Sequence, residues 1–116
     1  MTQQFRGHQR VTRRAEYQRI YDSGRKVHGR YLTMFALPRE GSAARLGIAA
    51  SRKLGGAVER NLAKRLMREM FRRNPAPPGF DFVVIPRRTL FDAPYSRLEA
   101  EYVATLERLR AGFPGR

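Results

Sequence analysis

Apolar residues recur at helical spacing in three segments of the chain, which predicts helices over residues 13–22, 57–73 and 96–111. The middle helix is expected to end before the proline-rich segment that follows it, because proline lacks the amide donor that a helix needs. Ser96 and Glu99 fit a capping box, in which the two side chains satisfy free backbone amides of the first turn. The third helix is therefore expected to begin at Ser96.

Short apolar runs predict strands over residues 31–38, 45–51 and 81–86, and a further short strand over 26–29 is indicated more weakly. The first two runs are separated by a turn that contains Gly41, so they are expected to form a hairpin. Residues 81–86 are almost continuously apolar and rich in β-branched side chains, which is typical of a strand in the centre of a sheet.

The elements follow one another in the order α, β, β, α, β, α, with the weaker strand after the first helix. This order predicts an α+β sandwich, in which helices pack on a mixed sheet of about four strands. The 116 residues make one ordinary domain. We expect that domain to span residues 12–112, between a flexible basic arm (residues 1–11) and a short tail (residues 113–116).

Several classes of protein are excluded by composition. The chain contains no cysteine, which excludes disulfides and thiolate metal sites. Its longest clean apolar run, residues 82–85, is far shorter than the roughly 18 residues that a membrane-spanning helix needs. The first residues contain no apolar stretch of the kind found in secretory signals. These observations predict a soluble, cytoplasmic protein with no membrane partner.

The formal net charge is +14, and it is concentrated in two segments. Residues 1–30 carry eight basic and two acidic side chains, and residues 52–74 carry the same numbers, so each segment contributes +6. Arginine outnumbers lysine by 21 to 3. Guanidinium groups donate in pairs to phosphate and stack on bases, which favours a nucleic-acid partner, although a GC-rich coding sequence would also enrich arginine.

The second predicted helix has one face that carries only positive and neutral polar side chains. With Arg60 at its border, this face contains Asn61, Lys64, Arg65, Arg68 and Arg72. Solvated helix faces usually mix glutamate with lysine, because opposite charges four residues apart stabilise a helix. Here Lys64, Arg68 and Arg72 form a ladder of like charges, so a polyanionic partner explains the face better than solvent does.

Residues 51–69 read SRKLGGAVERNLAKRLMRE, a basic loop followed by the start of this helix. The run resembles the signature of the bacterial ribonuclease P protein subunit family, in which a Lys-x-Gly loop precedes a helix reading Ala-Val-x-Arg-Asn-Arg-x-Lys-Arg-x-x-Arg-Glu. The resemblance extends to two aromatic residues four apart, Tyr17 and Tyr21, and to two basic residues, Arg87 and Arg88, after the last strand. It covers nearly the whole chain.

The chain departs from the family pattern in three respects. Leu62 replaces the second arginine of the Arg-Asn-Arg run and lies at the edge of the apolar face, so we expect it to pack rather than to bind RNA. The aromatic residues of the first helix, usually phenylalanine, are tyrosine in this chain. Ala49 replaces a small hydroxyl residue, which removes a hydrogen-bonding group.

The resemblance implies that the chain is the protein subunit of an endoribonuclease that removes the 5′ leader of precursor tRNA and leaves a 5′-phosphate. The RNA subunit with bound Mg²⁺ is the implied catalyst, so no catalytic or metal-binding residue is expected in the protein. The implied partners are the precursor tRNA and one ribonuclease P RNA for each protein monomer. The family also implies a left-handed crossover through the basic helix to a parallel strand, where general rules favour a right-handed one.

Two groups of site residues follow from the resemblance and from side-chain chemistry. The RNA subunit is expected to be bound by Arg52, Lys53, Arg60, Asn61, Lys64, Arg65, Arg68 and Arg72. A cleft for the single-stranded leader is expected to contain Tyr17, Tyr21, Phe35, Arg60 and Asn61. Single-stranded RNA is bound by aromatic rings that stack on bases and by cations along its backbone. For each aromatic ring, packing in the core is the alternative.

Two other functions are compatible with parts of the sequence. A protein-only nuclease needs clustered carboxylates or paired histidines, and the aspartates and histidines of this chain are scattered. A ribosomal or architectural RNA-binding protein has the same composition, and only the ordered motif argues against it. The motif therefore favours the subunit of a ribozyme.

Overall fold

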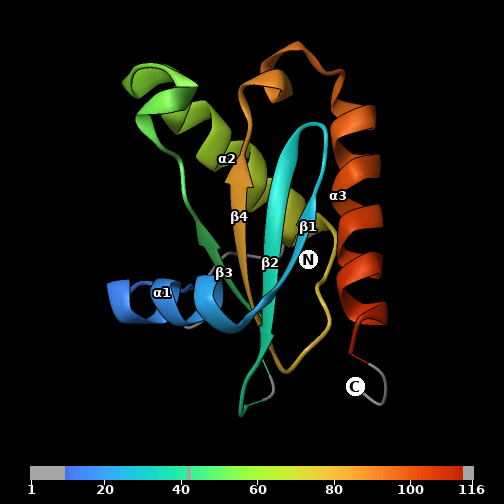
Figure 1. The fold of residues 1–116 in the computed structure, drawn as a ribbon. Coiled ribbons are helices and arrows are strands. Elements are labelled where there is room, and N and C mark those ends of the chain that lie inside the picture. The colour runs from blue at the N-terminus through green and yellow to red at the C-terminus, as the bar shows by residue number, and fades with distance from the viewer. Residues whose placement is uncertain (1–9, 42, 114–116) are drawn as a thin grey trace.

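The computed structural model describes residues 10–41 and 43–113 (Figure 1). In this part of the chain, three helices and four strands are joined by loops and two short 3₁₀ helices. Their bounds are α1 (Arg14–Ser23), β1 (Arg25–His28), β2 (Leu32–Pro38), β3 (Arg45–Ile48), η2 (Arg52–Leu54), α2 (Ala57–Arg73), β4 (Phe80–Pro86), η3 (Arg88–Asp92) and α3 (Tyr95–Ala111). The strands form one mixed sheet in the order β1-β2-β4-β3, which confirms the predicted α+β sandwich.

Strand β4 lies in the interior of the sheet, as the apolar sequence of this strand predicts. This strand is antiparallel to β2 along the full length of both, and it is parallel to β3 on its other side. The predicted hairpin between residues 31–38 and 45–51 is therefore wrong, and β2 forms its hairpin with β1, the weakly indicated strand. The physical reason is that β4 is apolar on both faces and must lie inside the sheet, which separates β2 from the shorter β3.

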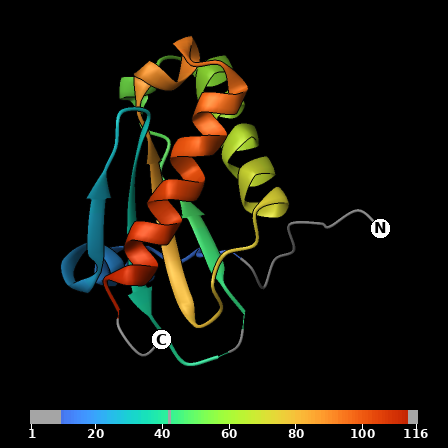
Figure 2. The ribbon, with the colours of Figure 1, turned by 90° about the vertical axis from the view of Figure 1, so that its right-hand side faces the viewer.

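The connection from β3 through α2 to β4 joins two parallel neighbours, and it is left-handed. In Figure 1 both strands run upward with β4 to the right of β3, and Figure 2 places α2 behind the sheet in that view. A right-handed connection would pass in front. The crossover implied by the family resemblance is therefore present.

The two faces of the sheet are covered unequally (Figure 2). One face packs against α2 and α3 and holds the main hydrophobic core, which includes Met34, Phe82 and Tyr102. The other face packs against α1, where Ile20 and Val83 are fully buried. Because one helix covers less of a sheet than two, several apolar side chains of this second face stay half-buried.

The apolar side of α2 follows the predicted periodicity, and Ala63, Met67 and Met70 are fully buried against the sheet. Leu62 is half-buried, beside this apolar stripe. Val58, at the start of the helix, is 79% exposed and takes no part in the core. The polar side of α2 is thus turned away from the sheet, as the spacing of its charges predicts.

The start of α3 differs from the predicted one. The helix begins one residue before Ser96, with Pro94 in the cap position, and the predicted capping box does not form. Proline is well tolerated at this position, because an amide at the start of a helix has no partner within the helix. The Glu99 carboxylate instead accepts a hydrogen bond from Asn74 at 3.0 Å and lies 3.6 Å from Nε of Arg73. Glu99 therefore joins the end of α2 to α3.

The start of α1 is also shifted, because the cap position falls on Arg13 and not on the predicted Thr12. The Arg13 amide donates to the Glu16 carboxylate at 3.3 Å. A glutamate three residues after the cap supplies this half of a capping box, which favours the later start.

A buried carboxylate joins three elements at one end of the sheet. Asp81 of β4 is fully buried, and its oxygens lie 2.8 Å from Nε of Arg39 and from Nε and Nη2 of Arg45. Arg45 also donates to Glu16 of α1 at 2.8 Å. This hydrogen bond lowers the pKa of Glu16, and the bond to Asp81 raises the pKa of Arg45. The cluster therefore joins α1 to β3 and β4 at the end of the sheet where these two strands pair.

A second carboxylate fastens α3 to the turn between β1 and β2. The side chain of Glu101 accepts hydrogen bonds from the backbone amides of Arg30, Tyr31 and Leu32 at 2.8, 2.7 and 3.0 Å. Backbone amides in a tight turn have few partners of their own, so one carboxylate satisfies three of them. The turn at the far end of the sheet is thereby held in place.

The fold extends slightly beyond the predicted domain at both ends. Val11, placed in the flexible arm by the sequence, is buried, and its amide donates to the carbonyl of Leu46 at 3.0 Å. Phe113, placed in the tail, packs on Phe80 with ring centroids 5.3 Å apart. The residues before Arg10 and after Phe113 lie outside the described part of the chain.

Candidate nucleic-acid interface

The basic loop before α2 is shaped by its serine and its glycines. The Ser51 hydroxyl accepts a hydrogen bond from the Lys53 amide at 3.3 Å and so begins the short helix η2. Gly55 has φ of +132° and ψ of −152°, a conformation that side-chain-bearing residues avoid. The loop turns there into α2, and it leaves Arg52 and Lys53 exposed.

The polar face of α2 is accessible, as the sequence predicts. Asn61, Arg65, Arg68 and Arg72 are exposed, and Arg60 and Lys64 are half-buried. Among the described residues, the arginines that form ion pairs are Arg39, Arg45, Arg73 and Arg110, so every predicted RNA-binding cation lacks a carboxylate partner. We call Arg52, Lys53 and these six residues of α2 the basic face.

The acidic residues of α2 lie away from the centre of this face. The Glu59 side chain folds back over Gly55, where an added Cβ would lie 3.1 Å from its Cγ. Glu69 is half-buried and forms no ion pair in the described structure, although the sequence allows one with Arg65. The basic face therefore keeps its full positive charge, which an approaching polyanion would meet.

The three aromatic residues of the predicted leader cleft lie together on the second face of the sheet. The ring centroids of Tyr17 and Tyr21 are 6.3 Å apart, and those of Tyr21 and Phe35 are 5.1 Å apart with the rings edge to face. Each ring is half-buried, so the core-packing alternative accounts for part of each surface. The ammonium group of Lys26 lies 5.7 Å from the Phe35 centroid. We call these three rings the aromatic surface.

The basic face and the aromatic surface approach each other at the edge strand β3, because α2 packs against this strand and Gly47 of β3 lies under the Tyr17 ring. Burial raises the pKa of Tyr17, whereas a hydrogen bond with the Ile48 backbone and the nearby charge of Arg68 act to lower it. Arg68 of α2 and Tyr17 of α1 are thus close enough to interact electrostatically. No hydrogen bond or ring contact in the described structure joins Arg60 or Asn61 to the three rings, so their place in the cleft stays a prediction.

Several residues of this region were not identified from the sequence. Lys26 lies directly opposite Phe35 in the pairing of β1 with β2, and Gly47 lies under the Tyr17 ring. Their positions depend on which strands pair, and the pairing predicted from the sequence was wrong. Lys26 and His28 are two residues apart in β1 and so share one face of the sheet. A correct prediction that β1 pairs with β2 would have placed them beside Phe35 and Thr33.

Gly47→Ala is expected to displace the Tyr17 ring, because the added Cβ would lie 2.8 Å from Cε1, Cζ and Oη of that ring. Overpacking of this kind costs about 1–3 kcal/mol, which a urea unfolding curve would measure. In a Tyr17→Ala background the same change should cost much less, because the obstructing ring is absent. Equal losses in the two backgrounds would show that the ring does not restrict this position.

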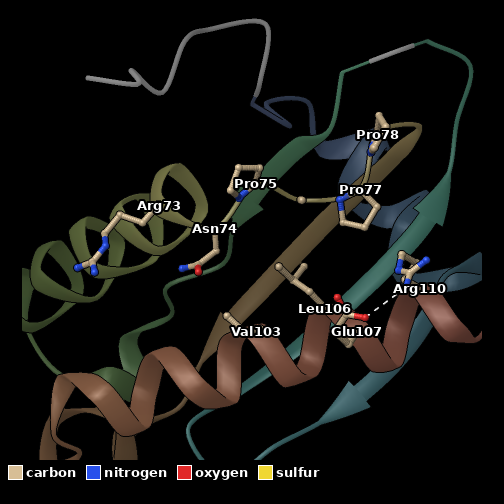
Figure 3. A pocket seen from close by; sticks show the side chains of 10 residues that line it. Arg73, Asn74, Pro75, Pro77, Pro78, Val103, Leu106, Glu107 and Arg110 are labelled. Carbon is tan, nitrogen blue, oxygen red and sulfur yellow. Dashed lines mark hydrogen bonds and ion pairs between the residues drawn. The ribbon is translucent and has the colours of Figure 1, made fainter. Parts of the chain in front are cut away.

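A separate groove lies between α3 and the proline-rich segment that follows α2 (Figure 3). It is lined by Arg73, Asn74, Pro75, Ala76, Pro77, Pro78, Val103, Leu106, Glu107 and Arg110. Glu107 and Arg110 are paired with each other at 3.3 Å. None of the predicted RNA-binding residues lines this groove, so it is distinct from the basic face and the aromatic surface.

Residues 10–41 and 43–113 lack two features that other functions require. No three histidine, aspartate or glutamate side chains among residues 10–41 and 43–113 lie in a group that could hold a metal ion. No helix in the same part of the chain is long and apolar enough to cross a membrane.

Comparison with known proteins gives consistent matches. The family model described as Ribonuclease P matches residues 5–110. A ribonuclease P protein component from Oleidesulfovibrio alaskensis is 47% identical over 85 residues, which are 70% of this chain and 68% of that protein. Another, from Desulfovibrio desulfuricans, is 39% identical over 112 residues, which cover 91% of this chain and 86% of that protein.

Solved structures agree with these matches. The RNase P protein from Thermotoga maritima superposes with a TM-score of 0.79 at 34% identity, over 85% of this chain and 96% of that one. The RNase P protein from Staphylococcus aureus superposes with a TM-score of 0.77 at 33% identity, over 85% of this chain and 93% of that one.

Proposed function

The chain belongs to the ribonuclease P protein family, and from this premise we propose how its surfaces share the work of processing precursor tRNA. The basic face binds the RNA subunit of ribonuclease P, and the aromatic surface binds the 5′ leader of the precursor. One observation supports this assignment of one RNA to each surface: cations without carboxylate partners lie in a row near three half-exposed aromatic rings.

The basic face suits a folded RNA because its cations are closely spaced and fixed on one helix. Arginine side chains that project from successive turns of α2 can each neutralise a phosphate and release its counterions. Asn61, neutral among these cations, supplies a donor and an acceptor for a specific hydrogen bond. Binding by this face is therefore expected to weaken steeply with salt.

The aromatic surface suits a single strand. Bases stack on aromatic rings largely regardless of their identity, and nearby cations hold the backbone. Tyr21 and Phe35 present half-exposed rings for stacking, with Lys26 beside them and Arg68 beside Tyr17. A leader of any sequence can therefore be held, as a processing enzyme with many precursors requires.

The chemical step in this proposal belongs to the RNA subunit and its Mg²⁺ ions. The protein supplies no group to bond breaking, and its part is to bind both RNAs in the cytoplasm, one protein for each RNA subunit. The product is a tRNA with a 5′-phosphate and a released leader. Mg²⁺ is thus a cofactor of the complex, held mainly by RNA.

A reconstitution at low Mg²⁺ tests the proposal. Precursor tRNA is incubated with a ribonuclease P RNA, with the protein, and with both together. Faster release of leader by the pair than by the RNA alone is the expected result. Cleavage by the protein alone would indicate a protein nuclease. An unchanged rate with both would leave a ribosomal or architectural RNA-binding protein as the better description.

A further inference from the structure

Beyond the aromatic surface, three polar side chains meet on the same face of the sheet. Nδ1 of His28 lies 2.8 Å from the Thr33 hydroxyl, and Nε2 of His28 lies 3.0 Å from Nη1 of Arg87. The same Arg87 nitrogen donates to the carbonyl oxygen of Gly29 at 2.6 Å. Thr33 is buried, whereas His28 is exposed and Arg87 is half-buried, so the cluster extends from the sheet to the surface.

The partners determine the protonation of His28 in this arrangement. A guanidinium group only donates hydrogen bonds, so Nε2 must be an acceptor without a proton. A neutral imidazole then carries its proton on Nδ1, which donates to the Thr33 hydroxyl. The arrangement therefore requires neutral His28.

The cluster continues the aromatic surface along the sheet. Lys26 pairs with Phe35, and two residues further along the same strands His28 pairs with Thr33. Residues two apart in a strand share one face and lie about 7 Å from each other. Thr33 in turn lies opposite Ile85 of β4, and Arg87 follows two residues later. The Arg87 guanidinium is thus held about two strand positions beyond the Phe35 ring.

We propose that His28 is a positioning residue for leader binding, a role that rests on the proposed function. The neutral imidazole and the Gly29 carbonyl hold the Arg87 guanidinium at the end of the aromatic surface, where it contacts a phosphate of the leader. The leader strand that stacks on Tyr21 and Phe35 is thereby also bound through one of its phosphates, by Arg87. Arg87 has donors to spare, because a guanidinium carries five N–H groups.

The hydrogen bond between His28 and Arg87 depends on pH. Protonation of Nε2 removes one of the two acceptors of Arg87 and places two positive charges in contact, so Arg87 is held less firmly. The charged groups around the imidazole are Arg87 after β4 and Lys26 on its own strand, with Arg30 at the adjoining turn. From α3, the Glu101 carboxylate faces that turn and is already engaged by three backbone amides.

The test compares variants at this position in the reconstituted holoenzyme. Binding of precursor tRNA with a leader is measured against binding of mature tRNA, and the ratio gives the leader's contribution. His28→Leu removes the acceptor, whereas His28→Gln keeps an acceptor oxygen that does not titrate. Arg88→Gln, which removes an exposed neighbouring charge, is the matched control. Circular dichroism melts establish that each variant is folded.

At about pH 7.5, His28→Leu and Arg87→Gln should each reduce the leader's contribution by roughly fivefold, the effect of one lost phosphate contact. His28→Gln and Arg88→Gln should match the unchanged protein. On acidification the unchanged protein should lose up to the same factor, because an imidazolium cannot accept a hydrogen bond from Arg87, and His28→Gln should not.

Full leader binding by His28→Leu, or the same pH dependence in His28→Gln as in the unchanged protein, would overturn the role of His28. Failure of the proposed function itself would look different, because the unchanged protein would then show no leader contribution at any pH.

Discussion

Replacing Asp81 by alanine is expected to lower the free energy of unfolding by about 3–5 kcal/mol, the cost of removing one partner from a buried ionic cluster. The carboxylate is fully buried and lies 2.8 Å from two guanidinium groups, so its loss leaves Arg39 without a carboxylate partner and Arg45 with Glu16 alone. For a domain of this size, each kcal/mol lowers the melting temperature by about 4–8 °C.

Thermal and urea unfolding monitored by circular dichroism would measure this loss. Asp92→Ala is the matched control, because Asp92 is exposed and forms no ion pair among the described residues. That control should change stability by less than about 0.5 kcal/mol. Equal melting temperatures for the two variants would show that the ionic cluster does not stabilise the fold.

Reversing two charges of the basic face, Arg65→Glu with Arg68→Glu, is expected to weaken binding of the RNA subunit on the order of a hundredfold at moderate salt. Both side chains are exposed on the helix, and neither contributes to the core. The slope of log affinity against log salt should also become shallower by about two, because at least two phosphate contacts are lost.

The control for this pair is Arg97→Glu with Arg108→Glu, which makes the same change in net charge, from +14 to +10, on exposed positions of α3. This second pair should bind RNA nearly as well as the unchanged protein, apart from a small long-range effect. Melting curves should be similar for both pairs. Equal weakening by the two pairs would mean that overall charge, and not the basic face, determines affinity.

The helices and the basic face could be predicted because their signals are local. Met67 and Arg68 are neighbours in sequence, and the 3.6-residue period turns one toward the sheet and the other toward the exposed polar face of α2. The interior position of β4 followed in the same way from its own composition. Periodicity therefore predicted the helices and the basic face, and local composition predicted the interior strand.

The pairing of strands could not be predicted because it depends on contacts between distant residues. No local pattern in β2 or β3 indicates that β4 lies between them. Asp81 of β4 pairs with Arg39, which follows β2, and with Arg45 of β3, and these contacts join residues that are far apart in the sequence. The missed residues of the second face follow from the same error. Lys26 and His28 are recognisable as neighbours of Phe35 and Thr33 only once β1 is paired with β2.

The sheet order also determines when the protein can fold during its synthesis. The β1–β2 hairpin and β3 are made first, but within the sheet they are joined by hydrogen bonds only through β4. Until residue 86 has emerged from the ribosome, the nascent chain carries the exposed basic residues of α2 without the strand that fixes that helix. Folding therefore waits for contacts between residues some fifty positions apart, such as Thr33 and Ile85, and such distant pairings slow it. The helix that carries the basic face is complete as a segment before the domain is, so its cations are synthesised before the strand that holds them in place.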